Sequence, residues 1–441
     1  MTVEIRMTGY LCDQIHQDLA RPHPFAAERI GFAFGRTGSL ANAGKLVLLT
    51  RYHSIPDEQY VEDENVGARI GREALTWAMQ AVYHGRPARE GIFHVHVHPH
   101  KGKTNMSRID RQEIPKLMPG FQSVGSEAAH GIIILSRDHG AGWVWLPSCR
   151  EPAAARAISV IRKPLGIFEV GGRRMSKDRF SRQSFLGPDS EARIARCTVG
   201  VVGLGGGGSH IVQQLAHIGF QRFVIYDGDV VENSNLNRLV GATSVDVAAE
   251  TSKSYVAKRM IFGLQRHAWV RGFAGRWQDN PEPLRECQIV FGCVDGYQGR
   301  HELEVSCRRY MMHYIDIGMD VHGENPPVIG GQVILSSPGG LCMRCMGFLT
   351  DEKMTEEAKR YGKAGARPQV VWANGVLAST AVGLAVDIVT GWTDRPLPHV
   401  YLSYDGSKGT VKESVTLRNL NLAACPHYSE SDVGDPIPVE L

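Results

Sequence analysis

Residues 198–229 read TVGVVGLGGGGSHIVQQLAHIGFQRFVIYDGD, and this run carries the strongest structural signal in the chain. An apolar strand pattern at Thr198–Val202 leads into a glycine-rich turn and a helical pattern at Ser209–Ile218, and a second apolar run follows at Arg222–Tyr226. Strand, turn, helix and strand in this order form a βαβ unit, which is typical of a parallel sheet covered by helices. The sequence therefore predicts an α/β domain with a mainly parallel sheet.

The glycine-rich turn is a candidate phosphate site. Gly203, Gly205, Gly206 and Gly208 lie between a strand and a helix, the position in which such a turn holds phosphate at a helix N-terminus. Asp227 follows 19 residues after Gly208, where a carboxylate contacts the ribose of a bound nucleotide. Dinucleotide dehydrogenases and ATP-using enzymes share these features, so they leave both classes open.

The polar residues that follow favour ATP. They are Asp229, Asn235, Arg238, Lys253 and Asp295. Hydride transfer does not need an arginine, a lysine and extra carboxylates around the nucleotide. Attack of a carboxylate on the α-phosphate of ATP needs cations at the phosphates and an aspartate for Mg²⁺. The sequence therefore predicts an adenylating enzyme that uses ATP and Mg²⁺.

This set resembles the ThiF/MoeB and ubiquitin-activating-enzyme adenylyltransferases, including an upstream segment Arg179-Phe-Ser-Arg182-Gln183. The resemblance implies a Rossmann-like adenylation domain at residues 172–441 that activates the C-terminus of a ubiquitin-like protein. It also implies that the domain is a homodimer. In the roles it implies, ribose is bound by Asp227 and Asp229, phosphates by Asn235, Arg238 and Lys253, magnesium by Asp295, and the partner subunit's ATP by Arg182.

A second metal site is suggested by cysteines. Relatives of this kind often bind structural zinc with two CxxC pairs, but only Cys342-Met-Arg-Cys345 is present, and Val370-Val-Trp-Ala373 stands near the expected second pair. Cys425 and His427 could complete a Cys₃His site, which is a known zinc donor set. The alternative is a reduced CxxC without metal.

The family resemblance also raises the question of a thioester. Its nucleophilic cysteine is expected after the first CxxC, yet residues 346–374 contain no cysteine. Either the reaction stops at the acyl adenylate or another cysteine serves. Cys293 and Cys307 lie in or beside apolar segments and are more typical of buried packing residues.

The N-terminal part has a different character. Short apolar runs at 30–34, 46–49, 92–97 and 131–135 surround one helical pattern at 67–83. This mixture predicts an α+β domain over residues 1–147. Residues 148–171 mix proline, glycine and arginine with little period, so we expect a linker there that contains one strand around 165–170.

This first domain contains a histidine cluster. His94, His96 and His98 alternate with valines, so on a strand their imidazoles project from one face. Ser107 and Asp110 follow in the pattern HxHP, seven residues, SxxD. Two neutral imidazoles and a carboxylate leave a tetrahedral Zn²⁺ with one open position, where bound water becomes a hydroxide source. We therefore expect His96, His98 and Asp110 to bind Zn²⁺.

Two further residues complete the predicted site. Glu28 is the candidate acid and base that takes the proton of the water, and Ser107 the candidate hydrogen-bond donor to the oxyanion. The whole pattern resembles the JAMM (MPN-plus) metallopeptidases, which are deubiquitinase-type zinc enzymes. The resemblance implies hydrolysis of a peptide or isopeptide bond at the C-terminus of a ubiquitin-like protein. His94 and His100 lie outside the pattern.

Composition limits the partners and the location. The 441 residues suggest two or three domains, and a net charge of +3 gives no sign of nucleic acid or an anionic membrane as a partner. Nine cysteines and an N-terminus without a signal pattern predict reduced thiols and a cytoplasmic protein. The apolar stretch 370–392 is interrupted by Asn374 and Asp387, which favours a buried helix over a membrane span.

Together these features predict a bifunctional enzyme of a bacterial ubiquitin-like pathway, with a conjugating enzyme as a further expected partner. Adenylation would activate a C-terminus, and the peptidase would mature the precursor or reverse conjugation. Activation of a sulfur carrier for cofactor or cysteine biosynthesis is one alternative. A non-catalytic scaffold role for one domain is another.

Overall fold

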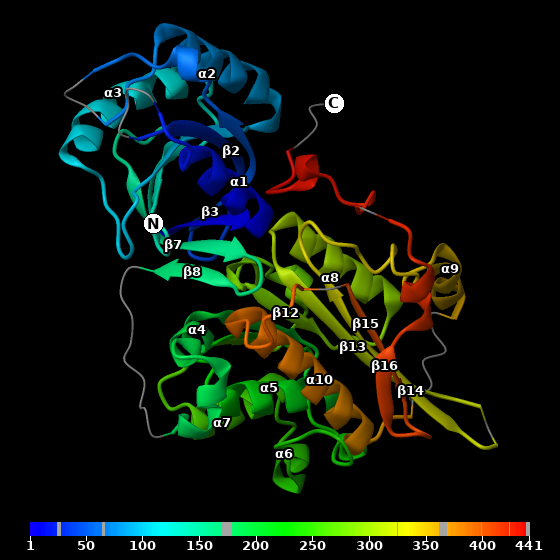
Figure 1. The fold of residues 1–441 in the computed structure, drawn as a ribbon. Helices are drawn as coiled ribbons and strands as arrows, with labels where there is room; N and C mark the ends of the chain where they lie inside the picture. The colour runs from blue at the N-terminus through cyan, green and yellow to red at the C-terminus, as the bar shows by residue number, and fades with distance from the viewer. Residues whose placement is uncertain are drawn as a thin grey trace. The chain divides into compact units, whose positions relative to one another are not determined.

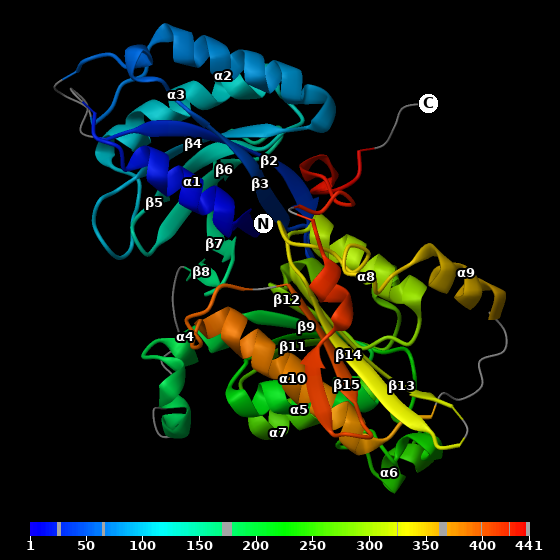
Figure 2. The same ribbon diagram turned by 45° about the vertical axis from the view of Figure 1, so that its right-hand side comes forward.

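The computed structural model describes residues 1–23, 28–63, 67–169, 179–323, 325–360, 368–397, 399–422 and 424–437. The chain forms two compact units (Figures 1 and 2). The first contains Met1–Ile161, Gly166–Gly172 and Ser429–Leu441, and the second contains Arg162–Leu165 and Arg173–Tyr428. Each unit is organised around its own sheet.

The first unit has a sheet that closes on itself. Among the described residues its order is β1-β3-β2-β4-β5-β6-β7-β8, and β1 also pairs with β7. The strands are β1 (Val3–Thr8), β2 (Ile30–Ser39), β3 (Lys45–Ser54), β4 (Gly91–Val97), β5 (His130–Leu135), β6 (Gly140–Trp145), β7 (Ala153–Ile161) and β8 (Gly166–Glu169).

Three helices pack on this sheet: α1 (Gly9–Leu19), α2 (Arg72–Gly85) and α3 (Arg108–Val124). Side chains alternate along β4, so Phe93 and Val95 join the core that includes α1, while Ile92 joins the core that includes α2 and α3. His94 and His96 share the face of Ile92 by the same alternation. The predicted apolar runs lie within β2, β3, β4 and β5. The predicted helix at 67–83 is α2, which begins at Arg72, and α1 and α3 were not predicted.

The predicted linker at 148–171 needs correction. It contains β8, which is the strand suggested around 165–170, but also β7, which was not predicted and closes the sheet through parallel pairing with β1. Its buried positions include Ala155 and Ala157, whose small side chains give a weak periodic signal. The C-terminal segment from Ser429 also belongs to the first unit and not to the adenylating part, where the sequence boundary at residue 441 had placed it.

The second unit confirms the predicted α/β fold. Its sheet has the order β11-β10-β9-β12-β13-β14-β15-β16, in which β9 to β13 are parallel and β14 to β16 antiparallel. The strands are β9 (Thr198–Val202), β10 (Arg222–Tyr226), β11 (Trp269–Phe273), β12 (Ile289–Gly292), β13 (His313–His322), β14 (Val328–Ser336), β15 (Val400–Asp405) and β16 (Thr410–Glu413). The strand order reverses between β9 and β12, and such a switch point is where open α/β sheets bind ligands.

The described helices of this unit are α4 (Ser190–Arg196), α5 (Gly206–Ile218), α6 (Ser244–Ala248), α7 (Lys253–Leu264), α8 (Tyr297–Arg309), α9 (Asp351–Arg360) and α10 (Val371–Thr390). Helix α10 lies beside α5 in both views (Figures 1 and 2) and also contacts β13 and β14. By length and composition α10 could cross a membrane, but 56% of its apolar window is buried within the protein. It therefore packs as the core helix that the sequence favours.

Candidate functional site

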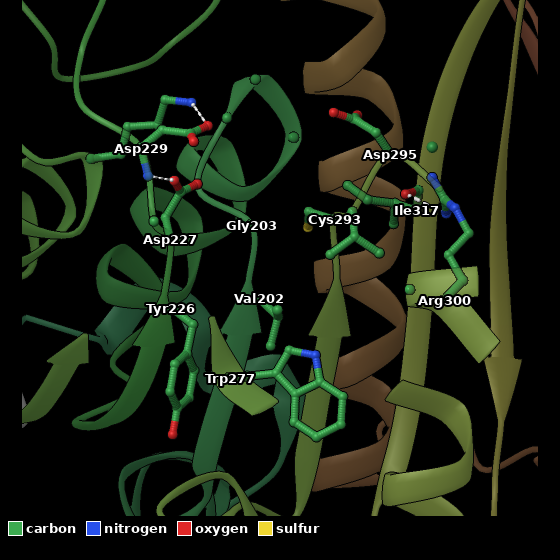
Figure 3. A pocket seen from close by; sticks show the side chains of 18 of the residues that line it. Val202, Gly203, Tyr226, Asp227, Asp229, Trp277, Cys293, Asp295, Arg300 and Ile317 are labelled. Atoms are coloured by element: carbon green, nitrogen blue, oxygen red, sulfur yellow. Dashed lines mark hydrogen bonds and ion pairs between the residues drawn. The ribbon is translucent and has the colours of Figure 1, made fainter. Parts of the chain in front are cut away.

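A cavity of about 360 Å³ opens at the carboxyl ends of β9, β10, β12 and β13, at the switch point of the second sheet (Figure 3). Asp227 and Asp229 lie on one side of it in Figure 3, and Asp295 and Arg300 on the other. Most of the predicted nucleotide-binding residues line this one cavity: Gly203, Gly205, Gly206, Asp227, Asp229, Arg238, Lys253 and Asp295.

Two glycines of the turn, Gly203 and Gly208, are required by close backbone approach. Gly203 has φ +88°, and a Cβ there would lie 2.4 Å from the carbonyl oxygen of Cys293. A Cβ at Gly208 would lie 1.9 Å from the carbonyl oxygen of Gly203, so Gly208 has a packing role beneath the turn. In the described chain no side chain caps α5, which begins at Gly206. Its first N–H groups are thus directed to the place where a phosphate would bind.

Asp227 organises the edge of the cavity. Its carboxylate accepts hydrogen bonds from the backbone N–H groups of Leu204 at 2.6 Å and Asp229 at 2.9 Å. Burial raises the pKa of this carboxyl above its ordinary value, and the charge of Lys253 and the two hydrogen bonds oppose that shift. The glycine turn and the end of β10 are therefore joined by one carboxylate.

Two cations stand where phosphates would be bound. Lys253 Nζ lies 2.7 Å from Asp229 Oδ2, and Arg238 Nη1 donates to the carbonyl oxygen of Ser234 at 2.7 Å. Both side chains line the cavity together with Asp295. Cations on one side and a carboxylate suited to Mg²⁺ on the other are what phosphoryl chemistry requires.

Besides Gly208, two predicted residues lie outside the lining of this cavity in the described chain. Asn235 is buried, and its Oδ1 accepts a hydrogen bond from Glu232 N at 3.2 Å, so it caps the short helical turn Asn233–Asn235. Arg182 is exposed on another turn, Ser181–Leu186. Asn235 therefore has a structural role here. Arg182 does not line the cavity of its own chain among the described residues.

The structure adds residues that the sequence did not indicate. Arg300 Nη1 binds Asp316 at 2.5 Å and the carbonyl oxygen of Ile317 at 3.0 Å, which holds its guanidinium in the cavity wall. Asn374 enters from α10, and its Nδ2 donates to Val370 O at 3.1 Å. The one sequence signal was that Asn374 interrupts an apolar stretch. No local sequence pattern distinguishes Arg300 from the other arginines of the chain.

The two cysteines considered as nucleophiles differ in position. Cys307 is fully buried on α8, as a packing residue is. Cys293 lines the cavity, but burial raises the pKa of its thiol well above the ordinary value. A neutral thiol is a weak nucleophile, so this raised pKa does not favour Cys293 as an acyl carrier.

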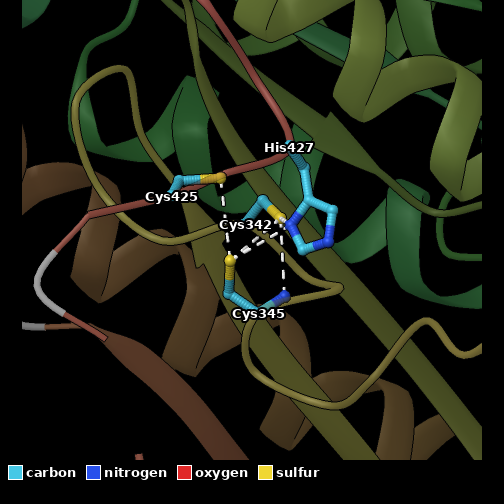
Figure 4. A group of neighbouring side chains, drawn as sticks. All are labelled: Cys342, Cys345, Cys425 and His427. Atoms are coloured by element: carbon cyan, nitrogen blue, oxygen red, sulfur yellow. Dashed lines mark hydrogen bonds between the residues drawn. The ribbon is translucent and has the colours of Figure 1, made fainter. Parts of the chain in front are cut away.

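The four residues of the proposed Cys₃His site converge (Figure 4). Cys342 Sγ lies 3.6 Å from Cys345 Sγ, which lies 3.6 Å from Cys425 Sγ, and His427 Nδ1 lies 3.3 Å from Cys345 Sγ. The ligand atoms are all within 4.8 Å of one another. Three thiolates and one imidazole fit a closed, tetrahedral structural Zn²⁺.

The predicted peptidase residues of the first unit also converge. His96 Nε2 lies 3.3 Å from His98 Nε2 and 3.8 Å from Asp110 Oδ2. Glu28 Oε1 lies 4.0 Å from His98 Nε2. Strand register explains part of this, because Ile30 of β2 pairs with His96 of β4 and so places Glu28 close by. The side-chain donor atoms of Glu28, His96 and His98 all lie within 4.8 Å of one another, and Asp110 approaches this group at His96.

The N-terminus of α3 positions Asp110. Ser107 is the N-cap, its Oγ accepts a hydrogen bond from Asp110 N at 3.1 Å, and Asp110 Oδ2 accepts one from Ser107 N at 2.8 Å. Burial acts to raise the pKa of Asp110, but His96 and the bonds to Ser107 lower it overall. The carboxyl is therefore held ionised, as a metal ligand must be.

Burial sets the protonation states of the other groups. It lowers the pKa of His96 to about 4, so this imidazole is neutral at neutral pH and able to bind metal. It raises the pKa of Glu28, which suits a group that accepts and returns a proton. His94 is buried behind His96, with ring centroids 5.6 Å apart, and His100 is exposed.

A sheet with an ATP-sized, cation-bearing cavity at its switch point defines a nucleotide-binding enzyme domain. The ThiF family model matches residues 179–427, more than half of the chain, and the protein belongs to this family. This confirms the resemblance to ThiF/MoeB-type adenylyltransferases. The match begins at residue 179, so the interpretation of the first unit rests on its own geometry.

Individual relatives agree with the family. The SAMP-activating enzyme E1 of Haloferax volcanii is 32% identical over 174 residues, which are 38% of this chain and 61% of that protein. The sulfur carrier protein adenylyltransferase of Thermus thermophilus is 26% identical over 254 residues, 56% of this chain and 90% of that protein. The chain thus spans less than two thirds of the Haloferax relative. The structure of E. coli MccB with ATP aligns at a TM-score of 0.45 and 19% identity, covering 54% of this chain and 71% of that one.

Proposed function

We propose that the second unit adenylates the C-terminal carboxylate of a ubiquitin-like protein, with ATP and Mg²⁺. The observation that carries this proposal is the convergence of the glycine turn, Asp227, Arg238, Lys253 and Asp295 on one cavity. Two relatives, an activating enzyme E1 for SAMP and an adenylyltransferase for a sulfur carrier protein, belong to the same reaction class.

Each residue has a defined task in this reaction. The N–H groups of α5, Lys253 and Arg238 bind the phosphates, and Asp227 accepts hydrogen bonds from the ribose. The substrate carboxylate attacks the α-phosphorus, its oxygen forms the new P–O bond, and pyrophosphate leaves with the bonding electron pair. Asp295 would hold Mg²⁺, which when bound neutralises the charge of the phosphates.

Pyrophosphate exchange tests this proposal. Exchange should require a ubiquitin-like protein and should be lost in Asp295→Ala. Glu413→Ala is the matched control, because Glu413 is exposed on β16 away from the cavity lining. Exchange that persists in Asp295→Ala would remove this carboxylate from the reaction.

We also propose that the first unit is a JAMM-type zinc peptidase that cleaves peptide or isopeptide bonds at such a C-terminus. His96, His98 and Asp110 would hold Zn²⁺, which when bound lowers the pKa of water and polarises the scissile carbonyl. Glu28 takes the proton of the attacking water and delivers it to the leaving amine. The Ser107 hydroxyl keeps its proton while its oxygen caps α3, so it remains able to donate to an oxyanion.

Metal content and cleavage test this second activity separately. Glu28→Gln should keep zinc but lose cleavage of a ubiquitin-like fusion, and His96→Ala with His98→Ala should lose one zinc per chain. Glu113→Gln, an exposed glutamate on α3, is the control for a neutral substitution. Normal cleavage by Glu28→Gln would reassign the acid and base.

The Cys₃His cluster supports a structural role for a second zinc, because its four donors leave no open position for chemistry. Sulfur-carrier activation shares the adenylation step and is the alternative outcome. A thiocarboxylate product would identify that alternative, whereas an isopeptide made with a conjugating enzyme would identify ubiquitin-like modification.

A further inference from the structure

His98 is held differently from the other predicted zinc ligands. Its Nε2 faces His96 Nε2 at 3.3 Å and Glu28 Oε1 at 4.0 Å, so Nε2 is the nitrogen directed at the metal position. Its other nitrogen, Nδ1, lies 3.0 Å from the hydroxyl oxygen of Thr104. When Nε2 offers its lone pair to a metal, Nδ1 carries the proton and donates it to Thr104 Oγ1.

Thr104 is delivered by a loop that is fixed at several points. Gly102 N donates to Asp138 Oδ1 at 2.6 Å, and the Gly102 carbonyl oxygen accepts from Ser136 Oγ at 2.7 Å. His100 O accepts from Arg137 N at 3.2 Å. The loop is therefore bound to the β5–β6 turn two residues before Thr104.

The backbone at Gly102 requires glycine for conformation and not for space. Its φ is +92°, whereas a Cβ built there would meet nothing within 4 Å. A positive φ turns the chain so that both polar groups of Gly102 reach the β5–β6 turn. Ser136, whose hydroxyl donates a hydrogen bond to the Gly102 carbonyl oxygen, is buried.

We propose that Thr104 is a positioning residue for the metal ligand His98, and that the loop 99–106 is anchored by Ser136 and Asp138 to hold it there. This inference rests on the proposed zinc site of the first unit. When Nε2 binds the metal, the Thr104 oxygen accepts the Nδ1–H hydrogen bond and so fixes the rotation of the ring. Partners of this kind typically change metal affinity by roughly 10- to 100-fold when removed.

The test is chelator competition for zinc in the full-length chain. Thr104→Val keeps the shape of the side chain but removes the hydroxyl, and should weaken zinc binding by about 10-fold or more. Thr104→Ser keeps the hydroxyl and should bind zinc nearly as the unmodified protein does. Thr76→Val is the control, because the Thr76 hydroxyl binds only Arg72 O of its own helix among the contacts described.

Zinc in the Cys₃His cluster is subtracted by measuring the His96→Ala, His98→Ala chain in parallel. A second arm uses Asp138→Ala, which frees Gly102 N and should weaken zinc binding in the same direction. The thermal unfolding of each variant, compared with that of the unmodified protein, reports whether the first unit is folded.

Two outcomes would overturn the inference and are distinguishable. If the unmodified protein holds one more zinc than the double-histidine variant and Thr104→Val binds it equally well, Thr104 has no positioning role. If the unmodified protein holds no more zinc than the double-histidine variant, the zinc site itself is wrong, and the inference fails with it.

Discussion

At the scale of single residues, the proposed peptidase site depends on small separations around Glu28. The backbone N–H of Glu28 donates to Gly67 O at 3.0 Å, and a Cβ at Gly67 would lie 3.3 Å from both Cδ and Oε2 of the Glu28 side chain. The neighbouring Arg29 is buried and binds Asp57 at 2.7 Å. The carboxylate is thus confined by its backbone, by Gly67 and by the anchoring of the next residue.

Gly67→Ala should displace the Glu28 carboxylate without touching a metal ligand. We expect cleavage to fall by about tenfold or more while zinc content is unchanged, because misplacing a reacting group by even part of an ångström is costly. Cleavage rate and bound zinc are measured on the same preparation. Gly263→Ala, where the added Cβ meets nothing within 4 Å, is the control. Unchanged cleavage would show that Glu28 is not confined by Gly67.

His94 predicts a pH dependence of stability. Burial lowers the pKa of His94 to about 3 from its ordinary value of 6.5. Below pH 6.5 the unfolded chain therefore binds a proton that the folded chain refuses, so stability present above 6.5 is lost as the pH falls towards 3. One such histidine accounts for about 1 kcal/mol over the first pH unit below its ordinary pKa.

The measurement is the urea midpoint of the metal-free protein between pH 7 and 5, compared with His94→Phe. The phenylalanine fits the apolar contact with Phe32, whose ring centroid lies 6.5 Å from that of His94. The variant should lose less stability on acidification. An identical pH slope in both proteins would contradict the assignment.

At the scale of elements, the sequence was informative wherever the structure is local. The β9-α5-β10 unit and the His96, His98, Ser107 and Asp110 pattern each lie within a short run, so spacing alone revealed them. Arg300 and Asn374 reach the nucleotide cavity from α8 and α10. No local sequence pattern indicates that side chains from these helices line the cavity. Strand β7 was missed because its buried alanines resemble a turn-rich segment more than an apolar strand.

Helix α8 carries a buried glutamate that connects the two segments of the Cys₃His site. Glu304 on this helix is fully buried, and its carboxylate accepts from Met343 N at 2.8 Å and from the Tyr428 hydroxyl at 3.2 Å. It therefore joins the CxxC turn to the segment that carries His427. Arg308 of the same helix adds to this connection, because it donates to Gly340 O and its guanidinium lies over the Tyr428 ring.

Glu304→Ala should weaken zinc retention in the cluster and destabilise the second unit by about 1 to 3 kcal/mol, since two buried hydrogen bonds are lost. Zinc release and thiol reactivity during thermal unfolding give the measurement. Glu302→Ala is the control on the same helix, because Glu302 binds Gln278 and Gln298 instead. Equal zinc retention in both variants would assign Glu304 to packing alone.

At the scale of the whole molecule, the first unit is built from segments that are far apart in the sequence, and no local pattern indicates this. After the second unit the chain returns to the first, where Asp435 Oδ2 accepts from Ser39 N at 2.9 Å and Asp435 N donates to Thr37 O at 3.0 Å. Ser39 and Asp435 are 396 residues apart in the sequence. A boundary at residue 147 would remove β7, β8 and this C-terminal segment from the first unit, so both proposed activities are best measured in the full chain.

The remaining prediction concerns assembly. Arg182 is exposed and lies outside the described lining of the cavity, and the family resemblance implies that it serves the partner subunit's ATP. Arg182→Ala and Asp295→Ala chains should each be nearly inactive in pyrophosphate exchange. In a mixed dimer the Arg182→Ala chain keeps its own Asp295 and receives an intact Arg182 from its partner, so one site of the two is complete. Random exchange makes half of the dimers mixed, which gives roughly a quarter of the unmodified activity by symmetry. No recovery after verified subunit exchange would show that Arg182 acts within its own chain or not at all.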